Sequence, residues 1–245
     1  MSALGRNRAA QPRESTGITE LDEVVGGGLL RPSDTLVIGP VGSGTTSFCR
    51  QFVVSSLLTG RKVVAICTDE STEHFLRHFG SLKSFDVGFY LDEKKFIIVD
   101  LYTRLMEHIG IHDYADIDPS KEVSIDRVIP DTVKYLLGDS REELKGYNAV
   151  FDSITALSPI LAVRDVHRLF REGQKVVREG NHVLLITAHE GALEGNFIQV
   201  ARQQVDNVIR MKTRWVRPNL KREMIIEKMS YTEIKQPVLG YTITD

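Results

Sequence analysis

Short apolar runs alternate along the chain with longer segments in which apolar residues recur every three or four positions. The runs are apolar on both faces, which is typical of buried strands in a parallel sheet, and the recurrent spacing predicts helices. Strands that alternate with helices predict an α/β fold, with a mostly parallel central sheet flanked by helices on both faces. The predicted strands are 36–38, 63–67, 96–100, 147–151 and 182–187, and the predicted helices are 48–58, 73–79, 131–144 and 163–179.

The two ends of the chain and one internal segment have other patterns. Residues 205–212, 223–229 and 240–244 predict a closing set of strands that is partly antiparallel, and residues 1–14 predict a mobile tail before one domain at 15–245. Residues 103–130 are polar without a sustained period, which predicts a helix fragment and a long loop. His108 and His112 raise the possibility of a metal site there, but their loose spacing favours a solvated loop.

A glycine-rich turn joins the first predicted strand to the first predicted helix. Gly39, Gly44 and Thr46 fall on fixed positions of the phosphate-loop pattern G-x-x-x-x-G-K-[ST]. Such a loop aims backbone N–H groups at a phosphate chain, the helix N-terminus adds its dipole, and the Ser/Thr hydroxyl ligates Mg²⁺. The turn therefore predicts a nucleotide site, the alternative being a turn that binds nothing. The candidate nucleotide-binding residues are Gly39, Pro40, Val41, Gly42, Ser43, Gly44, Thr45, Thr46 and Ser47.

Polar residues follow the ends of several predicted strands. In an open parallel sheet, ligands bind beyond the carboxyl ends of the strands, so these residues are expected to share one crevice with the glycine-rich turn. This convergence favours nucleotide binding over an empty turn. The polar residues at the strand ends are Asp69, Glu70, Asp152, Ser153 and residues 187–190, which include His189.

Each acidic or basic candidate has a chemical role and a plain structural alternative. Asp152 would hold Mg²⁺ beside the Thr46 hydroxyl, although Asp is also a common helix N-cap. Glu70 would polarise an attacking water as a general base, or it is a surface carboxylate next to a helix cap. His189 would sense the γ-phosphate, or it is an ordinary histidine at a strand end.

Composition narrows the class of protein. The chain has 245 residues, of which 42% are hydrophobic, and a net charge of −2, which gives no reason to expect strong attraction to nucleic acid or anionic membranes. Cys49 and Cys67 lie in apolar surroundings without a C-x-x-C motif, so a disulfide framework and a zinc site are not expected. No apolar run reaches transmembrane length, and the default expectation is a reduced, cytoplasmic protein without membrane insertion.

The N-terminal motifs resemble the signature of KaiC-like proteins, a branch of the RecA superfamily of P-loop NTPases. The helix at 48–58 and the next strand are also similar to the archaellum motor ATPase, a KaiC relative. The resemblance runs from about residue 15 to the C-terminus and implies a RecA-like fold, ATP or ADP with Mg²⁺ as ligands, and a homo-oligomer. It rests here on Thr16-Gly17-Ile18, Leu21-Asp22, Gly26-Gly27-Gly28-Leu29 and the glycine-rich turn.

Three later stretches carry the same resemblance. Asp69-Glu70-Ser71 is similar to the family's acidic pair, in which the second carboxylate is the catalytic glutamate. Val150-Phe151-Asp152-Ser153 is similar to its Walker-B stretch, and Glu227-Lys228-Met229 to its late lysine-containing strand.

Two positions depart from the family pattern. Thr45 stands where the phosphate-loop lysine is expected, and Ser230 stands where relatives carry an arginine that reaches the neighbouring subunit's phosphate. Both missing groups are cations that offset charge on the γ-phosphoryl group in the transition state. The sequence therefore predicts weak nucleotide binding and an inactive or very slow ATPase that acts in signalling or assembly, with itself or a KaiC-like partner.

Two alternatives remain open. One is an active ATPase that takes a lysine from elsewhere, such as Lys228 of a neighbour. The other is a RecA-like nucleic-acid-binding protein, against which the near-neutral charge argues; its candidate patch is Arg214-Trp215-Val216-Arg217.

Overall fold

The computed structural model describes residues 11–82, 85–103, 146–157, 163–191 and 197–243. The predicted helix at 131–144 and nearly all of the segment 103–130, with His108 and His112, lie outside the described residues. No helix in the described part is both long enough and apolar enough to cross a membrane.

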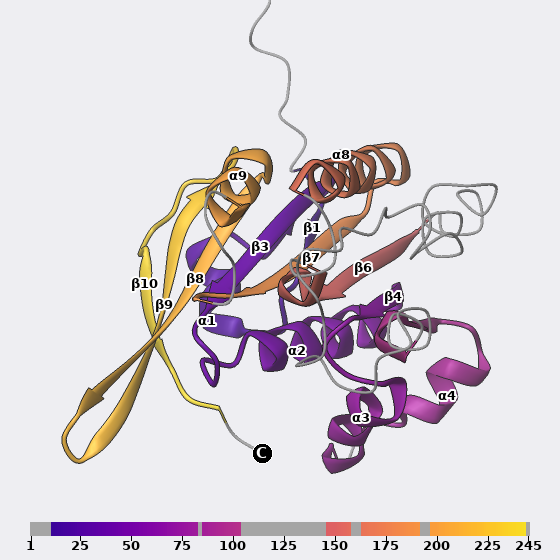
Figure 1. The fold of residues 1–245 in the computed structure, drawn as a ribbon, viewed down its shortest axis with the longest axis horizontal. Coiled ribbons are helices and arrows are strands. Elements are labelled where there is room, and N and C mark those ends of the chain that lie inside the picture. Colours follow the sequence, from indigo (N-terminus) through magenta and orange to yellow (C-terminus); the bar gives the residue numbers. More distant parts are fainter. Residues whose placement is uncertain (1–10, 83–84, 104–145, 158–162, 192–196, 244–245) are drawn as a thin grey trace, which may run out of the picture.

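The centre of the molecule is an eight-stranded sheet in the order β10-β9-β8-β3-β7-β6-β4-β5 (Figure 1). The strands from β8 to β5 in this order pair in parallel, whereas β9 and β10 pair antiparallel. The mostly parallel α/β sheet predicted from the sequence is confirmed. The strands are β3 (Ser33–Gly39), β4 (Lys62–Cys67), β5 (Phe96–Asp100), β6 (Tyr147–Asp152), β7 (Val183–His189), β8 (Asn207–Val216), β9 (Asn219–Met229) and β10 (Val238–Tyr241).

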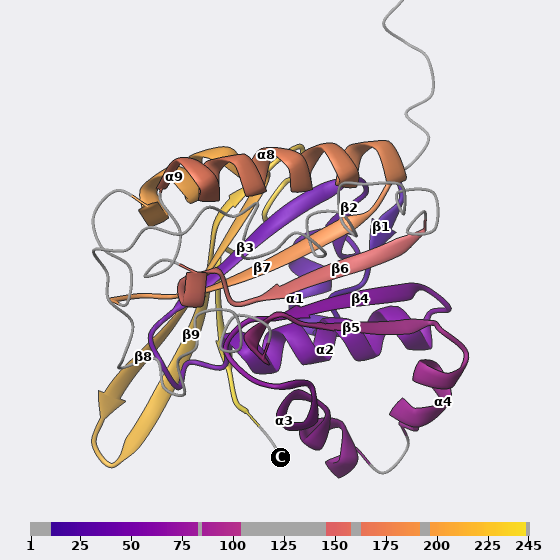
Figure 2. The ribbon, with the colours of Figure 1, turned by 45° about the vertical axis from the view of Figure 1, so that its right-hand side comes forward.

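Helices cover both faces of this sheet, so each face has its own apolar core (Figure 2). On one face α2 (Thr45–Leu58) buries Phe48 and Phe52 against the central strands, and α3 (Thr72–Arg77) adds Phe75. On the other face α8 (Val163–Gly180) and α9 (Phe197–Gln204) pack with the second core. The smaller helices are α1 (Thr19–Val24), α4 (Val87–Asp92) and the 3₁₀ turns η1 (His78–Ser81) and η4 (Ile154–Leu157).

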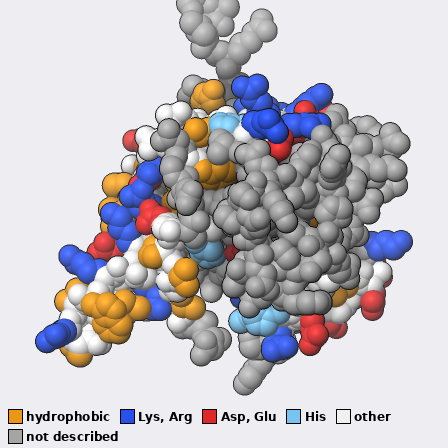
Figure 3. Space-filling model, viewed as in Figure 1, with side chains coloured by type: hydrophobic (Ala, Val, Ile, Leu, Met, Phe, Trp, Pro, Cys, Tyr) orange, Lys and Arg blue, Asp and Glu red, His pale blue; other side chains and the backbone are white. Residues whose placement is uncertain are grey.

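Two of the closing strands, β8 and β9, are longer than the sequence predicted, whereas β10 begins and ends earlier than the predicted strand at 240–244. β8 and β9 form a hairpin that projects beyond the rest of the sheet, at the lower left of Figure 1. Trp215 is 74% exposed near its tip, where Figure 3 shows apolar side chains beside Lys and Arg. The Arg214–Arg217 stretch is thus part of an exposed hairpin.

The predicted N-terminal tail needs a correction at its end. Arg13–Glu14 form the short strand β1, which pairs antiparallel with β2 (Leu29–Leu30). Glu14 is buried and accepts a hydrogen bond of 2.9 Å from Arg31. A buried carboxylate with an ion-pair partner ties these residues to the fold, so they are not part of a tail. Residues 1–10 lie outside the described residues.

Candidate functional site

The glycine-rich loop lies between β3, which ends at Gly39, and α2, which begins at Thr45. Gly44 precedes the helix with φ of 94°, a left-handed conformation that glycine adopts without strain. A Cβ atom at Gly39 would lie 2.5 Å from Ser43 Oγ and 2.7 Å from the Met211 carbonyl oxygen. The loop therefore has the strand–turn–helix context that a phosphate loop requires. Both motif positions disfavour a side chain, Gly39 because of close neighbours and Gly44 because of its backbone conformation.

The side chains of the loop divide into buried and exposed ones. Ser43 and Thr45 are buried, whereas Val41 and Ser47 are exposed and Thr46 is half-buried. Ser43 Oγ has no hydrogen-bond partner, and the Ser43 carbonyl accepts a bond of 2.5 Å from Tyr241 in β10. The residue at the lysine position is thus a neutral, buried threonine at the start of α2.

Asp152, the last residue of β6, lies within hydrogen-bonding distance of Thr46 at the start of α2. Thr46 Oγ1 donates a hydrogen bond of 3.4 Å to Asp152 Oδ1, and Thr187 Oγ1 in β7 donates to the same oxygen. Burial raises the pKa of Asp152 to about 6, a rise that the Thr187 hydrogen bond partly offsets. A cation placed between Thr46 and Asp152 would remove this desolvation penalty, so these two oxygen donors suit Mg²⁺.

Asp69, Ser153 and His189 form one hydrogen-bonded cluster at the same sheet edge. Ser153 Oγ donates a bond of 2.5 Å to Asp69 Oδ2, and His189 Nε2 lies 3.3 Å from that oxygen. The hydrogen bond with Asp69 raises the pKa of His189 above its ordinary value, against the effect of burial. The strand predicted at 182–187 begins one residue later, at Val183, and ends two residues later, at His189, because β7 pairs with β3 up to Gly39. The strand ends therefore converge on the loop, as expected.

Glu70 differs from the expectation of a carboxylate available to water. Arg50 Nη2 in α2 donates a bond of 2.5 Å to Glu70 Oε1, and His74 Nδ1 in α3 lies 2.5 Å from Glu70 Oε2. Each carboxylate oxygen therefore has a partner. Neither partner was predicted. The four-residue spacing of Glu70 and His74 on either side of the Ser71 N-cap is a local signal for their contact, whereas nothing local signals Arg50.

Lys228 and Ser230 lie away from the loop. β9 pairs Lys228 with Val208, which pairs with Leu36 in β3, three residues before Gly39. Lys228 Nζ donates to the Val205 carbonyl, and Ser230 Oγ donates a bond of 2.8 Å to the Asp206 carbonyl. Lys228 thus lies level with the middle of β3, about 10 Å along the strands from Gly39 at about 3.3 Å per residue. Ser230 follows it in the direction away from the loop. Any contribution to a phosphate would therefore be made at a neighbour's site.

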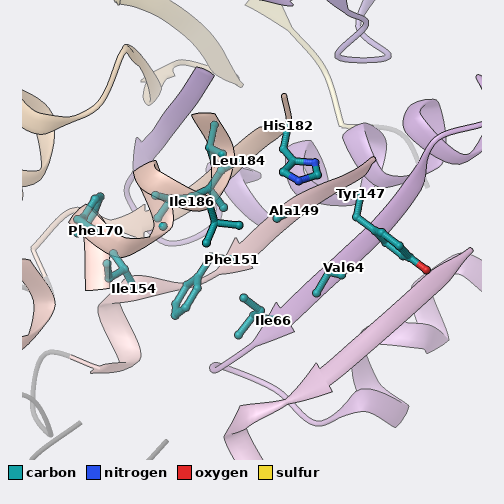
Figure 4. A pocket seen from close by; sticks show the side chains of 13 residues that line it. Val64, Ile66, Tyr147, Ala149, Phe151, Ile154, Phe170, His182, Leu184 and Ile186 are labelled. Carbon is teal, nitrogen blue, oxygen red and sulfur yellow. The ribbon is translucent and has the colours of Figure 1, made fainter. Parts of the chain in front are cut away.

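An apolar pocket lies on the α8 face of the sheet, apart from the glycine-rich loop (Figure 4). Strands β4, β6 and β7 form its floor, and Phe170 and Gly173 of α8 form part of its wall. Among the residues that the structure describes, its lining includes no Asp, Glu, Lys or Arg and no residue of 39–47. The described lining thus offers a phosphate no Lys or Arg side chain, and its residues are mostly apolar.

Comparison with known proteins gives consistent matches along the chain. The family model described as "ATPase: KaiC" matches residues 14–245. A UPF0273 protein of Thermotoga maritima is 27% identical over 238 residues, which cover 95% of this chain and 93% of that protein. A UPF0273 protein of Saccharolobus solfataricus is 30% identical over 239 residues, which cover 95% of this chain and 80% of that protein.

The fold also matches a solved structure. A KaiC-like protein from Pyrococcus horikoshii has a TM-score of 0.70 and 22% identity, and the match covers 96% of each chain. At this identity the likeness is one of fold, and it confirms the RecA-like architecture expected from the motifs.

Proposed function

Since the chain belongs to the KaiC ATPase family, we propose that it is a nucleotide-binding member with weak affinity and little or no ATP hydrolysis. In this proposal ATP or ADP binds with Mg²⁺ at residues 39–47, and the protein acts through assembly or signalling. Membership of the ATPase family supports a nucleotide as the ligand. The residues of this chain that differ from the family pattern support slow or absent hydrolysis.

Retained parts of the loop support nucleotide binding. The backbone N–H groups of the turn and the N-terminus of α2 need no particular side chain to meet a phosphate. Thr46 and Asp152 offer oxygen donors to Mg²⁺, and they already share a hydrogen bond of 3.4 Å. When Mg²⁺ is bound, it supplies charge neutralisation at the phosphates, whereas Thr46 and Asp152 hold and orient it.

The observation that carries the proposal is the buried Thr45 at the lysine position. A threonine hydroxyl places no positive charge against the β- and γ-phosphates. The contacts of Glu70 also disfavour hydrolysis, because both of its carboxylate oxygens already have a partner, Arg50 or His74, and neither is left to activate an attacking water. Weak binding and slow chemistry therefore have separate causes.

We expect assembly to depend little on nucleotide. In the family resemblance, an arginine at position 230 would link one subunit to its neighbour's phosphate, and Ser230 has no such reach. Any homo-oligomer is thus expected to be small or nucleotide-independent. Light scattering with and without ATP and Mg²⁺ tests this, and a hexamer that forms only with ATP would contradict it.

Calorimetry and an ATPase assay on the unmodified protein test the core of the proposal. We expect saturable ATP or ADP binding weaker than about 1 μM, reduced by Thr46→Val, and no turnover above background. Absence of binding at millimolar nucleotide would refute nucleotide binding. Turnover at an ordinary ATPase rate, about 1 s⁻¹ or more, would support the alternative of a cation supplied from elsewhere, such as a neighbour's Lys228.

The β8–β9 hairpin favours nucleic-acid binding as the second candidate function. Trp215 is 74% exposed between Arg214 and Arg217, which are also exposed. An aromatic ring flanked by cations can stack on a base and contact phosphates. A gel shift with single-stranded DNA that weakens steeply with salt and is lost in Trp215→Ala would favour this function.

A further inference from the structure

We propose that Glu70, His74 and His78 form a binding site for one divalent transition-metal cation, with Zn²⁺ as the test ion. The three residues each offer a ligand atom, and these atoms all lie within 4.8 Å of one another. The site lies in the segment that follows β4 and along α3 and η1, outside the glycine-rich loop.

Two features of the local structure bring the three ligands together. Glu70 lies just before Ser71, the N-cap of α3, and its Oε2 lies 2.5 Å from His74 Nδ1. His74 and His78 are four residues apart, a spacing that places two side chains on the same face of a helix. The α3 helix passes directly into η1, so this face continues from His74 to His78. The two imidazole rings are 5.7 Å apart, edge to face.

The donor set indicates the class of ion. Two imidazoles and one carboxylate are a common ligand set for Zn²⁺ and for other late divalent metals, whereas Mg²⁺ prefers oxygen donors. The histidines are exposed, the His74 side chain by 54%, so a water molecule can complete a four-coordinate shell. Figure 3 shows histidine atoms at the surface over α3.

Small side-chain movements are enough to form the coordination shell. In a tetrahedral Zn²⁺ site, ligand atoms lie about 3.4 Å apart, given metal–ligand bonds near 2.1 Å. The 2.5 Å contact between Glu70 and His74 would lengthen when the ion replaces the shared proton, and the widest separation of 4.8 Å would shorten. Rotation of exposed histidine side chains supplies both changes without backbone movement.

Arg50 explains how Glu70 can be held for such a role. Its guanidinium bonds to Glu70 Oε1, which leaves Oε2 facing His74. Metal-ligating carboxylates are usually held by an outer hydrogen bond of this kind. The positive charge also repels the cation, so micromolar affinity is expected rather than the tighter binding of a structural zinc site.

Two features distinguish this cluster from an ordinary Glu–His hydrogen-bonded pair. A Glu–His hydrogen bond involves only Glu70 and His74, whereas His78, one turn further along, places a second imidazole within 4.8 Å of both. The cation would also immobilise the carboxylate named above as the candidate general base. This second consequence rests on the proposed function, whereas the binding of the ion does not.

The test is Zn²⁺ titration of the full chain in calorimetry, with any histidine tag removed and no nucleotide present. We expect one saturable ion per chain at micromolar affinity. Co²⁺ should give the visible absorption of a four-coordinate site and compete with Zn²⁺. His74→Ala and His78→Ala should each weaken binding at least about tenfold, the lower end of the cost of disturbing a metal site.

Two controls make the outcome decisive. Glu73→Gln removes an exposed carboxylate from the same helix, and the double variant His108→Ala with His112→Ala removes the other histidine pair considered from the sequence; both should bind as the unmodified chain does. The proposal would be overturned if the unmodified chain shows no saturable Zn²⁺ binding. It would also be overturned if His74→Ala and His78→Ala bind Zn²⁺ as tightly as the unmodified chain does. Circular dichroism and thermal unfolding of every variant show that a loss of binding is not a loss of folding.

Discussion

Arg50 and Glu70 form an ion pair that joins α2 to the segment between β4 and α3, with 2.5 Å between Arg50 Nη2 and Glu70 Oε1. The two side chains are 14% and 15% exposed. The Arg50 guanidinium also lies 5.3 Å from the centre of the Phe75 ring, so it contacts α3 as well. One arginine thus links the helix after the glycine-rich loop to the candidate general base.

This ion pair should contribute measurably to stability. In a double-mutant cycle of Arg50→Gln and Glu70→Gln, we expect a coupling free energy on the order of 1 kcal/mol, because both partners are mostly shielded from water. Urea unfolding of the four proteins measures it. The control is the Arg77–Glu73 pair, which is 68% and 87% exposed at 3.4 Å and should show no measurable coupling. Equal coupling in both pairs would contradict the expected effect of burial.

Restoring the loop lysine should strengthen nucleotide binding. Thr45→Lys adds a charge-assisted contact worth roughly 1.5–3 kcal/mol, or about a tenfold to hundredfold gain in ATP affinity. Calorimetry with ATP and Mg²⁺ measures the gain. Leu58→Lys is the matched control, since it adds the same charge at an exposed position at the far end of α2 and should change affinity much less. A comparable gain in both variants would show that net charge alone is responsible.

Hydrolysis should require both missing cations. An arginine finger contributes about 10³–10⁵ in rate in GTPases, so Thr45→Lys combined with Ser230→Arg should restore slow ATP hydrolysis in an oligomer. Phosphate release measures the rate. Adding Glu70→Gln to the pair should abolish it. If the repaired variant binds ATP tightly and forms an oligomer yet stays inert, the role assigned to Ser230 or Glu70 is wrong.

Asp152 should make the metal-free protein less stable as the pH rises from about 4 to 6. Its pKa is raised from an ordinary value near 3.8 to about 6, mainly by burial, so between these values the folded state binds more protons than the unfolded state. Asp152→Asn should therefore stabilise the protein at pH 7, on the order of 2 kcal/mol. The gain should vanish near pH 3, where the carboxyl is mostly protonated in both states.

Urea unfolding at about pH 3, 5 and 7 with a chelator present measures this difference. Glu73→Gln, at an exposed position on α3, serves as the control and should leave the pH dependence unchanged. A stability loss in Asp152→Asn at pH 7 would mean that the ionised carboxylate is stabilised by its neighbours, contrary to the direction of its pKa.

Local patterns predicted most of the sheet, because a buried parallel strand needs an apolar run wherever it lies. The short helix α4 was not predicted, and it buries none of its residues, so it leaves little apolar period to detect. The end of β7 was placed too early, because pairing with β3, rather than residue type, carries that strand to His189.

The sequence by itself determined the α/β class, the glycine-rich turn, the missing lysine at Thr45 and the acidic residues at the strand ends. All of these depend on residue types at close spacing along the chain. Only the tertiary structure decided which side chains meet: Arg50 with Glu70, His189 with Asp69, and Thr46 with Asp152. These pairs join separate elements, so their contacts follow from strand order and helix packing, which spacing along the chain does not specify.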